Sequence, residues 1–151
     1  MIRAIRIVPG SLALAVALSS FAFAKCPISD GATVVVRSAI GDLHVDTSGK
    51  DSADVQVDNN AVQVQETCGK DVVQFTGNAS DQNKGTVAWK ITLPRTVHLD
   101  LVTMAGNITA GDLDANAILR TAGGSVNIGH IRGNATLISQ GGSIKAGNVG
   151  A

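Results

Sequence analysis

Aromatic side chains are the most obvious shortage in this chain. Its 151 residues include one Trp, three Phe and no Tyr. Proteins that hold single-stranded nucleic acid do so by stacking bases on several aromatic rings, and aromatic-lined sugar clefts have the same need. We therefore expect neither kind of site. The core must instead be built from Val, Ile, Leu and Ala, with 17 Gly supplying turns, which is a β-rich composition.

Charge is also scarce. Charged residues make up 16% of the chain, and 12 basic residues balance 12 acidic ones. A phosphate-binding surface needs a clustered excess of Lys and Arg, so we expect no nucleic-acid partner. The chain has no Gly-x-Ser-x-Gly nucleophile elbow, and no Lys-Ser/Thr follows its Gly pairs at 123–124 and 141–142 as in a phosphate loop. These absences predict a protein that is not an enzyme and uses no cofactor.

The first 24 residues have the pattern of an export signal. Arg3 and Arg6 precede an apolar run at 12–18, and Ala22-Phe23-Ala24 supplies the small residues of a cleavage site. The apolar run is too short to cross a hydrocarbon core of about 30 Å as a helix. We predict a signal peptide at 1–24 and one domain at 25–151, located in the periplasm, at the cell surface or outside the cell. An uncut N-terminal anchor is the alternative.

Cysteine occurs only twice, at Cys26 and Cys68, and both lie in the exported part. An even pair outside the cytosol favours a disulfide, which would tie the N-terminal end to a later strand. On the chain-entropy model, closing a loop of this length stabilises the fold by about 4 kcal/mol. A metal site is the alternative, but no further ligand at characteristic spacing accompanies the two cysteines, so we expect no metal.

The most specific pattern is a repeat near the C-terminus. Copies begin at Thr103, Thr121 and Ser139, a spacing of 18 residues, and need no gap for alignment. The positions that recur are two glycine columns and two apolar columns: Gly106, Gly124 and Gly142; Gly111, Gly129 and Gly147; Ile108, Val126 and Ile144; Leu113, Ile131 and Val149. Asn116 recurs as Asn134. Glycine at fixed places indicates turns that need positive φ or close backbone approach.

Such a short repeat cannot bury its own apolar face and must stack on copies of itself. Its alternating segments predict strands, so the repeat predicts a coil of chain with parallel strands about 4.8 Å apart. Each column then becomes a ladder. The Ser/Thr column at 103, 121 and 139 predicts a hydroxyl ladder, and Asn116 with Asn134 an amide ladder. The fold class predicted is all-β, a single-stranded parallel β-helix or solenoid, and we favour an irregular right-handed one.

The N-terminal half contains a less regular version of the same pattern. Residues 38–45 share the frame of residues 103–110, with Ser38 at the Thr103 position. Further strands are predicted at 54–58, 61–65, 71–76, 86–93 and 97–102. Residues 77–85 are polar and predict a loop. No domain boundary and no helix is expected within 25–151.

A strand that ends at Pro94, a second one at 97–101 and then Thr103-Met-Ala-Gly-Asn-Ile resemble the adhesin-like, domain-of-unknown-function family of bacterial β-strand-repeat proteins. The resemblance covers about residues 33–151. It implies an exported β-solenoid with a role in adhesion, and it brings no catalytic residues. One departure is that the last copy stops at Ala151 without a polar cap, which predicts either a truncated sequence or an end that pairs with another chain.

Other polar residues are candidates for metal or catalytic sites. His44, His98 and His130 lack the spacing of a metal site or triad, so we expect them on surface strands and turns. Asp112 and Asp114 could form a two-carboxylate glycosidase site, but position 112 becomes His130 and Asn148 in the next copies, which favours solvated turn surface. Calcium at Asp51, Asp54 and Asp58 is a further alternative.

Three functions follow in order of preference. The first is a non-catalytic exported module that binds an unknown surface ligand, either polysaccharide or protein. The second is a structural module that associates with itself through its open end. The third is a polysaccharide-active enzyme on a β-helix.

Overall fold

The computed structural model describes residues 22–58, 62–79 and 87–150, which form strands and turns without a helix. The predicted leader therefore lies outside the described residues, except for its last three, which begin the first strand. Within the described residues no helix is long and apolar enough to cross a membrane. The all-β class predicted from the repeat is confirmed.

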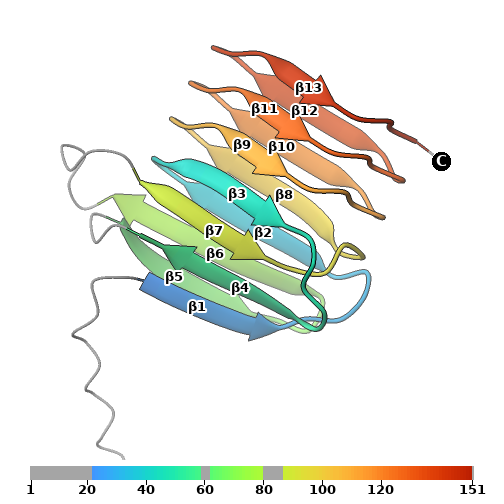
Figure 1. Ribbon diagram of the computed structural model, residues 1–151. Helices are drawn as coiled ribbons and strands as arrows, with labels where there is room; N and C mark the ends of the chain where they lie inside the picture. The colour runs from blue at the N-terminus through green and yellow to red at the C-terminus, as the bar shows by residue number, and fades with distance from the viewer. Residues whose placement is uncertain (1–21, 59–61, 80–86, 151) are drawn as a thin grey trace, which may run out of the picture.

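The strands form two sheets that lie face to face along the whole molecule (Figure 1). The seven-stranded sheet has the order β1 (Ala22–Pro27), β4 (Ser52–Val57), β7 (Ala88–Thr92), β3 (Asp42–Asp46), β9 (Ile108–Ala110), β11 (Val126–Ile128) and β13 (Ile144–Ala146). The six-stranded sheet has the order β5 (Val62–Cys68), β6 (Val72–Ala79), β2 (Thr33–Ser38), β8 (His98–Thr103), β10 (Ala117–Thr121) and β12 (Ala135–Ser139). One end of the molecule is thus made by β1 and β5 and the other by β13 and β12.

Parallel stacking at a shift of 18 residues organises the C-terminal half. Val126 of β11 pairs with Ile108 of β9 and with Ile144 of β13. Strands β8, β10 and β12 stack with the same shift in the other sheet, and bridges join Leu113 to Ile131 and Ile131 to Val149. The predicted pairing of equivalent residues between copies is confirmed at these positions.

The N-terminal copy joins the same stack from far away in sequence. Ser38 of β2 pairs with Thr103 of β8, and Leu43 of β3 pairs with Ile108 of β9. Residues 38–45 therefore lie directly on residues 103–110, with the shared frame in register. The shared frame is visible in the sequence, and the structure shows that the two segments pair directly although they are separated by about sixty residues of intervening chain.

The structure departs from an all-parallel coil in the N-terminal part. Strand β4 runs antiparallel to both β1 and β7, and β5 runs antiparallel to β6. Only Gly69, Lys70 and Asp71 connect β5 to β6. So short a connection can form a hairpin but cannot carry the chain across to a parallel neighbour. Two mixed open sheets therefore replace the predicted continuous parallel helix in this part.

The predicted loop at 77–85 is wrong at its start. Gly77, Asn78 and Ala79 continue β6 and pair with β5, and residues 80–85 lie outside the described residues. The reason is the fully buried Trp89, whose ring reaches across the core to Gly77, where a Cβ atom would overlap the indole. The glycine that suggested a loop instead makes room for the largest side chain of the core.

The core lies between the sheets and consists almost wholly of aliphatic side chains around two aromatic ones. Trp89 and Phe75 are fully buried, as are Leu43, Leu101 and Leu119. Strand residues alternate between this core and solvent, as in β8, where Leu99, Leu101 and Thr103 point inward. The composition predicted this kind of core.

Candidate functional site

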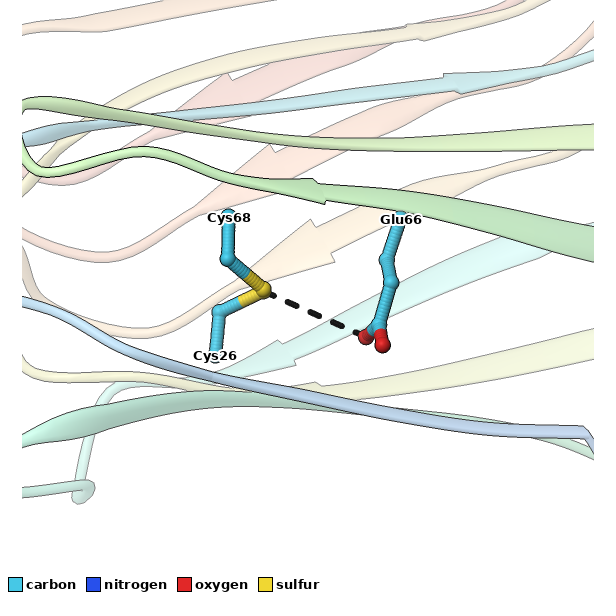
Figure 2. A group of neighbouring side chains, drawn as sticks. All are labelled: Cys26, Glu66 and Cys68. Carbon is cyan, nitrogen blue, oxygen red and sulfur yellow. Dashed lines mark hydrogen bonds between the residues drawn. A yellow bond between two sulfur atoms is a disulfide. The ribbon is translucent and has the colours of Figure 1, made fainter. Parts of the chain in front are cut away.

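The end made by β1 and β5 is closed by a covalent bond between the two sheets. The predicted disulfide is confirmed: Cys26 and Cys68 are joined, with their Cα atoms 5.5 Å apart (Figure 2). Cys26 is fully buried and Cys68 lies at the surface. Because β1 and β5 are the outer strands of opposite sheets, the bond ties the two sheets together where neither has a further strand among the described residues.

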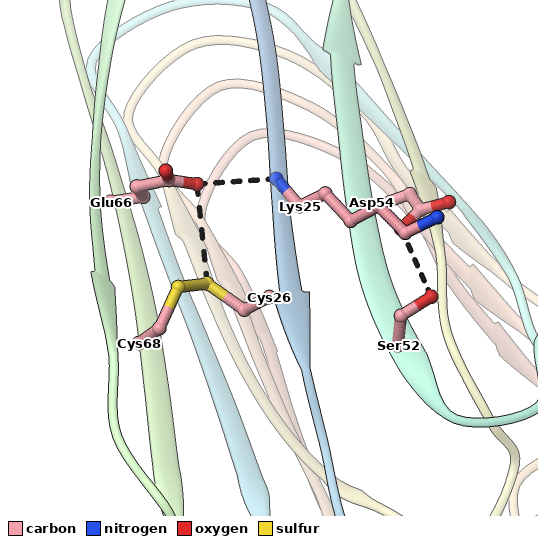
Figure 3. The surroundings of a disulfide bond; sticks show 6 residues. All are labelled: Lys25, Cys26, Ser52, Asp54, Glu66 and Cys68. Atoms are coloured by element: carbon pink, nitrogen blue, oxygen red, sulfur yellow. Dashed lines mark hydrogen bonds between the residues drawn. A yellow bond between two sulfur atoms is a disulfide. The ribbon is translucent and has the colours of Figure 1, made fainter. Parts of the chain in front are cut away.

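Glu66 lies beside this disulfide, two residues before Cys68 on the same side of β5 (Figures 2 and 3). Its Oε2 atom accepts a hydrogen bond of 3.1 Å from the backbone N–H of Lys25, and it lies 3.9 Å from the Cys26 sulfur. The second distance is a contact only, since a disulfide sulfur carries no hydrogen to donate. The carboxylate thus satisfies a backbone donor on the side of β1 where the described structure has no neighbouring strand.

Cys26, Glu66 and Cys68 are also the one group of His, Cys, Asp or Glu in the described residues whose ligand atoms all lie within 4.8 Å of one another. A cysteine binds a metal ion through its thiolate, and a disulfide does not provide a thiolate. In this oxidised form only the Glu66 carboxylate remains as a ligand. The disulfide and Glu66 therefore serve to join β1 to β5 at this end of the molecule.

The repeats are joined by a second kind of ladder, of which the sequence predicted only the part at Asn116 and Asn134. At each turn, a side chain of one copy accepts the backbone N–H of the residue that lies 18 positions later. The bonds run from Asn116 N to His98 Nδ1, Asn134 N to Asn116 Oδ1, Ser125 N to Asn107 Oδ1, Ser143 N to Ser125 Oγ, His130 N to Asp112 Oδ1 and Asn148 N to His130 Nδ1. Donors that the strands leave free are thereby paired between successive copies.

This ladder explains the column that reads Asp112, His130 and Asn148. Because the residue types differ, the pattern favoured solvated turn surface. All three side chains carry a hydrogen-bond acceptor, and the structure uses the acceptors of Asp112 and His130. The sequence therefore did carry a signal for this ladder: every residue of the column has a side-chain hydrogen-bond acceptor, although the residue types differ.

The Ser/Thr hydroxyls that were predicted to form a ladder bind backbone carbonyls rather than one another. Thr121 Oγ1 donates 2.8 Å to the carbonyl of Gly106, and Ser139 Oγ donates 2.6 Å to the carbonyl of Gly124. Thr103 makes the equivalent bond to Gly41 at 3.3 Å. Each hydroxyl therefore binds the glycine turn of the preceding copy in the stack.

The six glycines singled out from the repeat are required mainly for close approach. Only Gly106 among them has a positive φ, at 147°. A Cβ atom on Gly124 or Gly142 would overlap the glycine carbonyl of the copy below, and one on Gly147 would lie 2.9 Å from His130 Nδ1. At Gly129 the obstacle is Asp112 Oδ1, and at Gly111 it is Thr47 Oγ1 at 2.9 Å. The second glycine column thus leaves room for nearby side chains, among them two ladder acceptors.

The candidate carboxylates are engaged by neighbouring groups. Asp114 lies between Arg95 Nε at 3.1 Å and Arg132 Nε at 3.4 Å, and Asp112 is a ladder acceptor. Of the acidic trio weighed for calcium, Asp54 accepts from the Ser52 hydroxyl and Asp58 accepts from the Ala88 N–H. Four of these five carboxylates thus have a local structural partner, and within the described residues the structure does not bring either set together as a ligand or catalytic cluster.

The outward face of the seven-stranded sheet carries a continuous line of polar side chains, which we call the polar row. It consists of Gln56, Lys90, His44, Thr109, Asn127 and Lys145, each in register with the next. Adjacent strands are about 4.8 Å apart, so the row is roughly 24 Å long. Gln56, His44 and Lys90 also line a shallow cavity of about 320 Å³ together with Asp58 and Ala88.

Asp46 lies two residues after His44 on the same side of β3, and its carboxyl group has a lowered pKa. Its pKa lies below the ordinary value of 3.8, first because the Ser48 side chain hydrogen-bonds the carboxylate and then because the Ser48 backbone N–H does so at 2.9 Å. Burial acts in the opposite direction, with an effect smaller than that of Ser48 but larger than the further lowering of this pKa by the nearby Lys90 and His44. The face beside the polar row is thus electrostatically mixed.

The outward face of the six-stranded sheet carries different side chains. A line across the six-stranded sheet places Arg37 and Arg120 beside Val102 and the exposed Ile138. Met104 lies next to this line and is 66% exposed. The two outward faces therefore differ, one carrying the polar row and the other a line in which cations alternate with aliphatic groups.

The end made by β12 and β13 is open in the described structure. Ile144 and Val149 continue the two buried apolar columns, yet they are 44% and 47% exposed because no further strand covers them. The backbones of both outer strands also keep one edge without a neighbouring strand. Such an edge is a template for pairing with another chain.

No family model matches this chain, and no curated protein matches it. Among solved structures, one similar to it is a putative cell adhesion protein from Clostridium sporogenes, with 9% identity and a TM-score of 0.51 over 85% of this chain and 99% of that one. A putative lipid binding protein from Parabacteroides distasonis matches 84% of this chain and 61% of its own at 12% identity, with a TM-score of 0.41. At these identities the comparison shows only that this chain shares a fold with the Clostridium sporogenes protein.

Proposed function

We propose that the chain is an exported, non-catalytic module that binds an extended polysaccharide at a surface through the outward face of its seven-stranded sheet. The polar row is the observation that carries this proposal. It presents amide, hydroxyl, ammonium and imidazole groups at a regular spacing across the strands of the sheet. A hydroxyl-rich polymer lying across the strands can form hydrogen bonds with several of them at once.

Export is part of the same proposal. The leader pattern at 1–24 supports it, and so does the disulfide, since structural disulfides persist in oxidising compartments. The stacked C-terminal copies support the description of this part as a β-solenoid, and the resemblance to the adhesin-like bacterial family supports an adhesive role. The fold shared with the Clostridium sporogenes protein is in keeping with that role.

The test is retention of the exported protein on insoluble polysaccharides and on immobilised surface proteins, with the soluble fraction assayed for released sugar. We expect retention on a polysaccharide without released product. A double variant, Lys90→Ala with Asn127→Ala, removes two members of the row and should lower retention about tenfold or more. The matched control is Arg37→Ala with Arg120→Ala on the other face, which should bind normally.

Three outcomes would overturn the proposal in different ways. Released sugar would show catalysis and return attention to Asp112 and Asp114. Equal loss in both double variants would exclude the polar row as the binding face. Retention on proteins alone would show that the partner is a protein, and the row variants would then show whether the same face is used.

A second candidate function is self-association through the open end, favoured by the exposure of Ile144 and Val149 at two unpaired strand edges. The opposite end is closed by the disulfide, so we propose that the open end pairs with the open end of a second copy. Sedimentation over a range of concentrations should show a dimer that Ile144→Lys abolishes. A protein that stays monomeric at every concentration would exclude this candidate.

A further inference from the structure

The backbone nitrogen of Lys25 lies at a position where export processing changes its chemistry. It belongs to β1, the outer strand of its sheet, and it donates to Glu66 Oε2 across the closed end (Figure 3). The Lys25 side chain extends to the other side of the strand, toward Asp54 and Ser52 (Figure 3). Glu66 therefore faces the main chain of Lys25 and not its side-chain ammonium.

The predicted cleavage site is the bond just before this nitrogen. Hydrolysis of the Ala24–Lys25 amide adds one water: Ala24 leaves with a carboxylate, and the Lys25 nitrogen becomes an α-ammonium group. We propose that this cleavage converts the hydrogen bond between Lys25 and Glu66 into an ion pair that holds the new N-terminus against the closed end. The inference rests on the export proposed above, and it assigns Glu66 as the receptor for the processed N-terminus.

The disulfide makes this pairing specific for one cleavage position. Cys26 directly follows Lys25 and is tied to Cys68, two residues from Glu66 on β5. The new ammonium is therefore held one residue from a fixed point. Cleavage one residue earlier or later would place the ammonium on Ala24 or on Cys26, about 3.8 Å along the chain from the nitrogen that contacts the carboxylate.

Cleavage also removes contacts of β1, so that the ion pair between Lys25 and Glu66 is needed to hold what remains of this strand. Residues 22–24 pair with Val55, Gln56 and Val57 of β4, and these contacts leave with the leader. What remains of β1 is Lys25, Cys26 and Pro27. Such a short strand would fray, but the disulfide and an ion pair at its first residue hold it in place. The ammonium also supplies a positive partner for a carboxylate that otherwise has only a neutral donor.

The first experiment expresses the full chain with its leader in an exporting bacterium and determines the mass and first residue of the product. We expect a chain that begins at Lys25 with the disulfide formed. A product that begins at any other residue, or an uncut chain, overturns the inference. This measurement does not depend on whether the protein binds a surface.

The second experiment measures thermal unfolding of the processed protein and of its Glu66→Gln variant at about pH 6 and about pH 9.5. The α-amino group has an ordinary pKa of about 7.7–8.0, whereas Lys side chains stay charged to about 10.4. An ion pair raises the folded-state pKa of the amine, so its stabilisation is present at the lower pH and lost at the higher. We expect Glu66→Gln to lower Tm by about 2 °C at pH 6 and not at pH 9.5.

The matched control is Asp54→Asn, which removes the same charge near the Lys25 side chain. Its effect on Tm should not change between the two pH values, because that side chain remains an ammonium at both. If Glu66→Gln behaves like Asp54→Asn, or has no effect at pH 6, the ion pair does not form. Surface binding through the polar row would be unaffected by that result.

Discussion

Single atoms decide how closely the copies stack. The glycines of the first column meet glycine carbonyls of the copy below, and the hydroxyls of Thr121 and Ser139 bind those same carbonyls. A methyl group at such a glycine must push two backbones apart. Backbone strain adds to this at Gly106, whose φ is 147°.

We predict that Gly106→Ala lowers the free energy of unfolding by about 3 kcal/mol, from strain together with backbone overlap. The control is Gly123→Ala, where the nearest atom would lie 3.4 Å from the new Cβ and φ is ordinary, so little change is expected. Urea denaturation of both variants measures the difference. Equal effects would mean that backbone approach does not limit stacking.

A second residue-scale prediction concerns Asp46. Its pKa lies below 3.8 because Ser48 hydrogen-bonds the carboxylate, so its contribution to stability is present at neutral pH and is lost as pH falls through that lowered pKa. Following the Asp46 carboxyl carbon by NMR during an acid titration should give a midpoint below 3.8. Ser48→Ala should raise that midpoint, while Ser52→Ala should leave it unchanged.

At the scale of elements, strands of only three residues persist because each is bonded through the turns at its two ends to a neighbouring copy. Strands β9, β11 and β13 are too short for isolated stability, yet side-chain acceptors take the turn N–H groups between them. The unit that folds is therefore the stack rather than the strand, as expected for repeat proteins.

We predict that Asn116→Ala destabilises the protein by about 1–2 kcal/mol, because the N–H of Asn134 loses its acceptor at 2.9 Å. The control is Asn127→Ala on the outward face of β11, where the side chain is exposed and a change within about 0.5 kcal/mol is expected. Hydrogen exchange at the Asn134 amide should also accelerate in the first variant. Unchanged exchange there would contradict the ladder.

At the scale of the whole molecule, the two ends are opposites. One end has antiparallel outer strands joined by a disulfide, and the other has parallel outer strands with exposed Ile144 and Val149. Local stability should therefore fall from the closed end toward the open end, since each copy depends on its neighbours.

Replacing both cysteines by serine should lower the free energy of unfolding by about 2–4 kcal/mol, since the bond spans 42 residues of sequence. Hydrogen exchange should show the loss first in β1 and β5, with β10 and β11 changed less. A loss spread evenly over all strands would show that the molecule unfolds as one cooperative unit instead. Ala53→Ser on the buried side of β4 serves as a control for adding one hydroxyl near this end.

The sequence by itself determined the all-β class, the repeat register, the disulfide pair and the glycine positions, because each depends on spacing along one chain or on residue type. Tertiary structure decided the rest. The hairpin between β5 and β6, the Trp89 ring against Gly77, and the acceptor ladder through His98 and His130 all depend on which segments meet. So does the position of Glu66 beside Lys25, since Glu66 reaches that nitrogen only when the outer strands of two sheets are brought together.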